Sequence, residues 1–106
     1  MTGITKSAAA RSDLVDHFVY LAEEASETVA DRFLAKAEES FVVLAREPLI
    51  GAPLTLRDPQ LAGMRKWRVK DFDRFLVFYM PRPSGVLIAR VLHTSQDWWQ
   101  LLGYSD

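Results

Sequence analysis

The sequence predicts a single α+β domain in which an antiparallel helical hairpin packs on an antiparallel β-sheet. Apolar residues recur at helical spacing in the first half of the chain, over Ala8–Glu24 and from Ser26 to about Arg46. The second half contains short runs rich in Val, Ile, Phe, Tyr and Trp, separated by Asp, Pro and Gly, as in a β-meander. The chain has 106 residues, of which 49% are apolar and 25% charged, so residues 1–106 can bury one core.

The first elements are a short strand and a capped helix. Thr2–Lys6 is the candidate strand, and Ser7 is placed to cap a helix over Ala8–Glu24. One apolar stripe of this helix is expected to face the core. Its members are Leu14, Phe18 and Leu21, and the residues expected to face away from it are Asp13, Asp16, His17, Glu23 and Glu24.

A second helix is expected to run antiparallel to the first, because the connection at Ala25-Ser26 is short. Ser26 can cap this helix, and Pro48 ends it, since the residue before a proline resists helical geometry. Its apolar positions are Val29, Phe33, Ala37, Phe41 and Leu44. The stretch Glu47–Ala62 is expected to be a loop between the two layers.

Three strands are then predicted, at Met64–Val69, Arg74–Met80 and Val86–His93, followed by a short C-terminal helix capped by Thr94 or Ser95. The middle strand is apolar on both sides, which is typical of a strand that is covered on both faces. Two helices cover only one face of the sheet. The other face needs the first strand, the C-terminal segment or a second chain, so we expect a binding groove there.

The charges are divided unevenly between the two halves of the chain. Residues 1–47 carry five cationic and nine acidic side chains, whereas residues 48–106 carry eight and five, so their net charges are −4 and +3. These are either two solvated surfaces or a basic sheet that attracts an acidic protein segment or a phosphate backbone.

The composition disfavours several kinds of site. The chain has no cysteine and two histidines, so we expect neither a disulfide framework nor a protein metal site. It has no glycine-rich phosphate loop, and we expect no cofactor. No apolar run is long enough for a membrane span, and the N-terminus lacks the apolar run of a signal peptide. We therefore expect a cytoplasmic protein.

The order of a strand, a helical hairpin, a three-strand meander and a short tail resembles the ParE/RelE superfamily of type II toxin–antitoxin toxins. The resemblance covers nearly the whole chain and rests on the order and spacing of several segments. They are Ala8–Leu14, Ala30-Asp31-Arg32-Phe33, Glu47-Pro48-Leu49-Ile50-Gly51, Met64–Val69, Arg74–Tyr79 and Ile88–His93. The resemblance implies the RelE/ParE-like fold and a small antitoxin whose C-terminal segment wraps the toxin.

The helical hairpin and the Arg-Val-Leu-His end of the last strand are more similar to ParE than to RelE. ParE-like members are plasmid-stabilisation toxins that inhibit DNA gyrase by binding it and are neutralised by ParD-like antitoxins. RelE-like members cut mRNA on the ribosome, a task for which a strongly basic protein would gain affinity; this chain has a net charge of −1. We therefore expect a ParE-like growth inhibitor that is not an enzyme and does not bind nucleic acid directly. A RelE-like endoribonuclease is the alternative.

The two interpretations give the sheet residues different roles. In the RelE-like alternative, Arg68, Arg74 and Arg90 would stabilise phosphate charge, and His93 would transfer protons. In the ParE-like interpretation the arginines pair with antitoxin carboxylates, and His93 caps the strand end. The paired tryptophans of the tail either complete the core or anchor a partner. The expected partner-binding residues are Arg65, Trp67, Arg68, Arg74, Tyr79, Arg90, Trp98 and Trp99.

Overall fold

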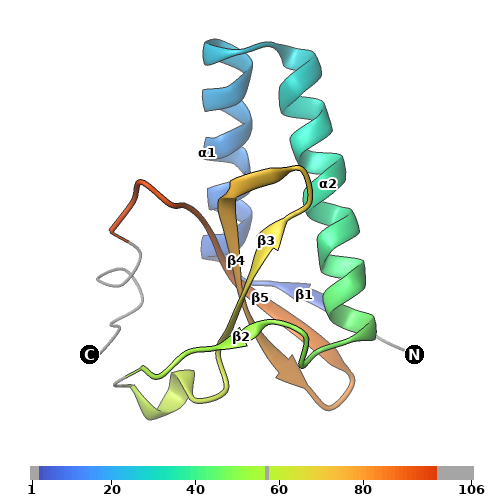
Figure 1. Cartoon of the computed structure of the whole chain (residues 1–106), viewed down its shortest axis with the longest axis vertical. Helices are drawn as coiled ribbons and strands as arrows, with labels where there is room; N and C mark the ends of the chain where they lie inside the picture. Colours follow the sequence, from blue (N-terminus) through green and yellow to red (C-terminus); the bar gives the residue numbers. More distant parts are fainter. Residues whose placement is uncertain (1–2, 57, 98–106) are drawn as a thin grey trace.

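A computed structural model describes residues 3–56 and 58–97 of the chain. A helical hairpin lies on one face of a five-stranded sheet (Figure 1), which confirms the α+β class. The elements are β1 (Gly3–Lys6), α1 (Ala8–Glu24), α2 (Glu27–Arg46), β2 (Ala52–Pro53), the 3₁₀ turn η1 (Pro59–Leu61), β3 (Arg65–Val69), β4 (Phe72–Arg82) and β5 (Gly85–His93).

The strand order in the sheet is β1-β5-β4-β3-β2. The predicted meander is formed by β3, β4 and β5, which pair antiparallel in sequence order, and β1 adds to β5 in parallel. The short strand β2 was not expected, because it lies inside the predicted loop. In it Ala52 pairs with Lys66 and Pro53 pairs with Arg65. A proline is tolerated there because β2 is an edge strand.

The predicted C-terminal helix is not confirmed. After β5 the backbone N–H of Gln96 donates to the His93 carbonyl at 2.9 Å, and the N–H of Thr94 donates to the Arg74 carbonyl at 2.7 Å. Residues 94–96 therefore turn back on the end of the sheet. The remainder of the predicted helix, with Trp98 and Trp99, lies outside the described residues.

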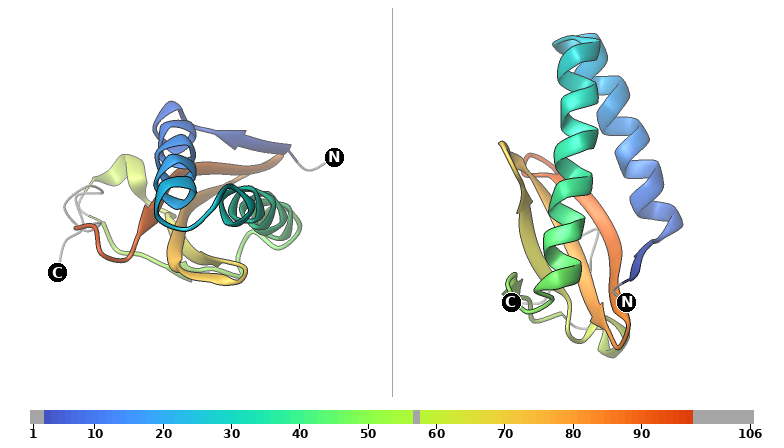
Figure 2. Two further views of the ribbon diagram at one scale, coloured as in Figure 1. Left: turned by 90° about the horizontal axis from the view of Figure 1, so that it is seen from above. Right: turned by 90° about the vertical axis from the view of Figure 1, so that its right-hand side faces the viewer.

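Both helices begin at the predicted serine caps. The Ser7 hydroxyl accepts a hydrogen bond from the N–H of Ala10 at 2.9 Å, and the Ser26 hydroxyl accepts one from the N–H of Val29 at 3.1 Å. Each bond satisfies a backbone donor that the first helical turn leaves unpaired. The hairpin extends well past the end of the sheet (Figure 2). In the described part of the chain, neither helix combines the length and apolar character needed to cross a membrane.

Of the polar residues of α1, Asp16, Glu23 and Glu24 are exposed as predicted. Asp13 and His17 are buried, so the prediction is wrong for these two. The two residues reach the edge of β5, which β1 pairs only as far as Ile88. Beyond that point the Val91 N–H donates to the Asp13 carboxylate at 2.9 Å, and His17 Nε2 lies 2.7 Å from the Val91 carbonyl oxygen. Because a carbonyl can only accept, His17 Nε2 is the donor.

Two further contacts complete this edge of the sheet. The Ser7 hydroxyl donates to the Ala89 carbonyl at 2.7 Å. The Arg90 guanidinium donates two hydrogen bonds to the Asp13 carboxylate, at 2.8 and 2.9 Å. A β-bulge near this point interrupts the alternation of β5. Asp13 thus neutralises a half-buried cation and pairs a backbone donor, which explains why a carboxylate is tolerated in the interior.

The second face of the sheet is covered by the chain itself, so the expectation of a bare face there is wrong. The segment between β2 and β3 folds across this face, and its leucines pack on the sheet. The residues buried on the face are Met64, Leu76, Phe78, Met80 and Leu92, and those that pack over them include Leu54, Leu56 and Leu61. An opening for a partner must therefore lie at an edge of the sheet.

Phe33→Ala tests how the hairpin packs on the sheet. The Phe33 ring is fully buried and lies 4.6 Å, centroid to centroid, from the Phe75 ring on β4. Removing it should lower the free energy of unfolding by about 3–5 kcal/mol in urea denaturation. Val15→Ala, on the exposed side of α1, is the control and should change it by less than about 0.5 kcal/mol. An unchanged urea midpoint for Phe33→Ala would place this ring outside the core.

Candidate functional site

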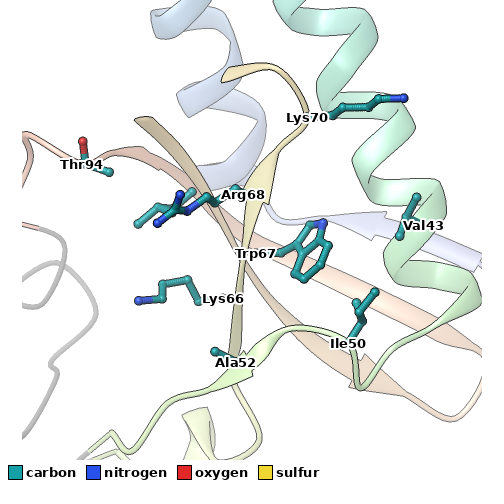
Figure 3. A pocket seen from close by; sticks show the side chains of 9 residues that line it. Val43, Ile50, Ala52, Lys66, Trp67, Arg68, Lys70 and Thr94 are labelled. Atoms are coloured by element: carbon teal, nitrogen blue, oxygen red, sulfur yellow. The ribbon is translucent and has the colours of Figure 1, made fainter. Parts of the chain in front are cut away.

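A cavity with a volume of about 880 Å³ lies at the outer edge of β3. It is walled by the C-terminal part of α2, the segment around β2, and β3 itself (Figure 3). The residues that line it are Val43, Ile50, Ala52, Lys66, Trp67, Arg68, Lys70, Leu76 and Thr94. We call this cavity the β3 groove.

Strand alternation gives the groove an apolar wall and a cationic wall. Trp67 points to the same side of β3 as Val43 and Ile50, whereas Arg68 and Lys66 project to the other side (Figure 3). Val43 and Ile50 keep about two-fifths of their surface exposed, at 40% and 39%. The groove therefore offers apolar surface next to positive charge.

Two cations of the groove, Arg68 and Lys70, are available for a partner. The Arg68 guanidinium and the Lys70 ammonium make no hydrogen bond or ion pair with the described residues, and both residues are exposed. Lys70 is held in place by its backbone, because its N–H donates to the Ser40 hydroxyl of α2 at 3.1 Å. Each cation can therefore pair with a carboxylate without breaking an existing salt bridge.

Part of the β3 edge has no strand beside it. Strand β2 pairs only with Arg65 and Lys66, and residues 67–69 have no outer strand neighbour among the described residues. An extended peptide can add to such an edge by main-chain hydrogen bonds. The groove thus combines an open edge, an apolar wall and the exposed cations Arg68 and Lys70.

Two of the residues expected to bind a partner hold the wall of the groove instead. The Tyr79 hydroxyl donates to the Pro48 carbonyl at 2.8 Å and accepts from the Gly51 N–H at 2.9 Å. Tyr79 is fully buried, and this burial raises the pKa of its hydroxyl. Arg65 donates to the carbonyls of Leu49 and Gly51, at 3.1 and 2.7 Å. Both side chains fix the segment that carries Ile50 and Ala52.

The other predicted residues are not gathered at the groove. Arg90 is bound to Asp13 at the opposite edge of the sheet. His93 pairs across the strands with Phe75, whereas Arg68 pairs with Leu76, so the two side chains lie on opposite faces. Burial, and then the nearby charges of His17 and Arg74, lower the pKa of His93. The structure therefore does not assemble Arg68, Arg90 and His93 into one site.

The sequence pattern identifies residues of β3 that line the groove, but it does not identify the lining residues that come from α2 and from the segment before β2. Trp67 and Arg68, two of the residues expected to bind a partner, lie in the groove, and Arg74 is exposed on β4. Val43 and Ile50 were not identified from the sequence as groove residues. In the sequence, Val43 is an ordinary apolar residue of a helix, and Ile50 is an ordinary apolar residue of a loop. The described residues contain no group of three or more His, Asp or Glu side chains placed to hold a metal ion.

Comparison with known proteins gives the family. A family model described as "ParE toxin of type II toxin-antitoxin system, parDE" matches residues 4–98. The chain belongs to the ParE toxin family. A search of the curated proteins finds no match. The ParE assignment agrees with the expectation from the helical hairpin and the last strand of the meander.

A solved structure shares the ParE-family fold. It is described as "Chromosomal ParDE TA system from P. aeruginosa", and it superimposes with a TM-score of 0.70 at 16% sequence identity. The similarity covers 88% of the present chain and 96% of the other chain. At this identity the comparison shows a common arrangement of helices and strands.

Proposed function

We propose that this ParE toxin inhibits DNA gyrase in the cytoplasm by binding it, and that a ParD-like antitoxin neutralises it by occupying the β3 groove. The open edge of β3, flanked by Trp67 and Arg68, carries the antitoxin part of the proposal. A strand of the antitoxin would continue the sheet there, and its neighbouring apolar residues would cover Val43, Ile50 and Trp67.

The charge of the groove defines the chemistry of its occupant. Arg68 and Lys70 are exposed cations without salt-bridge partners among the described residues, and Arg46 borders a smaller adjoining pocket with Lys70. An acidic segment would gain Coulomb attraction as it approaches and would form charge-assisted hydrogen bonds once bound. An acidic, amphipathic antitoxin segment is therefore the occupant that fits.

The proposed inhibition of gyrase needs no catalytic residue. Arg68 and His93 lie on opposite faces of the sheet, and Arg90 is already paired with Asp13 at the edge far from β3. General acid–base catalysis requires these groups within hydrogen-bond reach of one phosphate. This separation favours inhibition by binding over the RelE-like alternative.

Charge reversal in the groove should weaken the antitoxin complex. We expect the double variant Arg68→Glu/Lys70→Glu to bind the co-encoded antitoxin on the order of 100-fold more weakly, with a smaller dependence on salt, in calorimetric titrations. Arg82→Glu, at the exposed turn between β4 and β5, is the matched control and should bind like the unchanged toxin. Equal affinity for the groove variant and the control would place the antitoxin on another surface.

The gyrase proposal is tested by the free toxin. Addition of purified toxin to purified gyrase should abolish DNA supercoiling, and addition of the antitoxin should restore it. Expression of the toxin alone should stop growth with DNA damage and with intact messenger RNA at early times. Rapid loss of message with unaffected gyrase would contradict the proposal and support the endoribonuclease.

A further inference from the structure

A second, smaller cleft lies between α1 and the turn that follows β5, on the helix side of the sheet. Its volume is about 280 Å³. The residues that line it are Asp16, His17, Tyr20, Phe75, His93, Ser95 and Gln96. It shares no lining residue with the β3 groove, and three of its seven lining residues, Asp16, His17 and Tyr20, belong to α1. We call it the α1 cleft.

Aromatic rings form much of the α1 cleft. Phe75 is nearly buried, and the rings of His17 and His93 both contact it edge to face, with centroids 4.9 Å away in each case. Tyr20 is 56% exposed and lies one helical turn after Asp16 on α1. The cleft therefore places several ring surfaces close to a carboxylate.

The polar groups inside the cleft are already oriented. The Ser95 N–H donates to His93 Nδ1 at 3.0 Å, and the Gln96 side-chain oxygen accepts from the His93 N–H at 2.7 Å. His17 Nε2 is committed to the Val91 carbonyl. These bonds fix both imidazole rings, so the aromatic walls are formed before any ligand arrives.

A carboxylate lines the cleft on the α1 side, and the charge of Arg74 is close enough to His93 to lower the pKa of that imidazole. The Asp16 carboxylate is exposed and makes no ion pair or hydrogen bond within residues 3–56 and 58–97. Further along α1, Val19 is 47% exposed and Glu23 is exposed, so apolar and acidic surface continues from the cleft toward the tip of the hairpin. The charge of this surface is opposite to that of the β3 groove.

We propose that the α1 cleft binds an arginine side chain of a basic segment in a partner protein. A guanidinium fits because it stacks on aromatic faces and pairs with a carboxylate through two parallel hydrogen bonds. In this arrangement Asp16 pairs with the guanidinium, Tyr20 contacts its plane, and Glu23 meets another cation of the same segment. The partner and an antitoxin in the β3 groove would thus be recognised by opposite charges.

The test is a titration of the isotope-labelled toxin with a capped Ala-Arg-Ala peptide, followed by NMR. We expect saturable shifts of the amides of Tyr20, His93 and Ser95, with a dissociation constant in the millimolar range. The same peptide with citrulline in place of arginine keeps the shape and loses the charge, and should bind at least about tenfold more weakly. Equal binding of the two peptides, or the absence of saturable shifts at the cleft, would overturn the proposal.

Two variants separate the cleft from general attraction to an acidic helix. Asp16→Asn and Tyr20→Ala should each weaken binding of the arginine peptide about five- to tenfold. Asp31→Asn, on the exposed side of α2, removes the same charge elsewhere and should leave the affinity unchanged. Asp16 is exposed, so its replacement tests binding in a folded protein even if the Tyr20 variant is unstable. Equal losses for Asp16→Asn and Asp31→Asn would mean that the attraction is not specific to the cleft.

Discussion

The edges of the sheet are the constraint on which the rest of this structure depends. A five-stranded sheet has two edges whose backbone donors and acceptors need partners, and neither edge strand is long enough to supply them all. Side chains of the helical hairpin supply hydrogen-bond partners to backbone groups that the edge strands leave unpaired. At β5, Ser7, Asp13 and His17 of the α1 region bind backbone groups over residues 89–91. At β3, Ser40 of α2 binds the N–H of Lys70.

This arrangement decides where a partner can bind. Along this part of β5, the backbone groups of Ala89 and Val91 are bonded to side chains of the α1 region, and the loop between β2 and β3 covers the second face. The short edge at residues 67–69 stays open, next to exposed cations and to apolar side chains of α2 and β2. Under the proposed function, a strand of the antitoxin would add to the sheet at this opening.

The sequence predicts the features that depend on local periodicity and misses those that depend on distant contacts. The serine caps, the helices and the meander follow from patterns within a few residues. The role of Asp13 does not, because its partners Arg90 and Val91 are more than seventy residues away in the chain. Strand β2 carries no pattern of its own, since it has only two residues. In the groove, Trp67 and Arg68 follow from alternation along β3, whereas the inward position of Tyr79 depends on where residues 48–51 return to the sheet.

Amide exchange at Val91 in the Asp13→Ala variant tests the closure of the β5 edge most directly. The account predicts that this amide loses its protection and that the free energy of unfolding falls by about 2–4 kcal/mol, because Arg90 loses its partner in a half-buried site. Asp31→Ala, an exposed acid on α2, should change neither quantity. If the Val91 amide stays protected and the variant is as stable as the control, α1 does not close the β5 edge. There is then no structural basis for requiring a partner strand to add at the β3 edge.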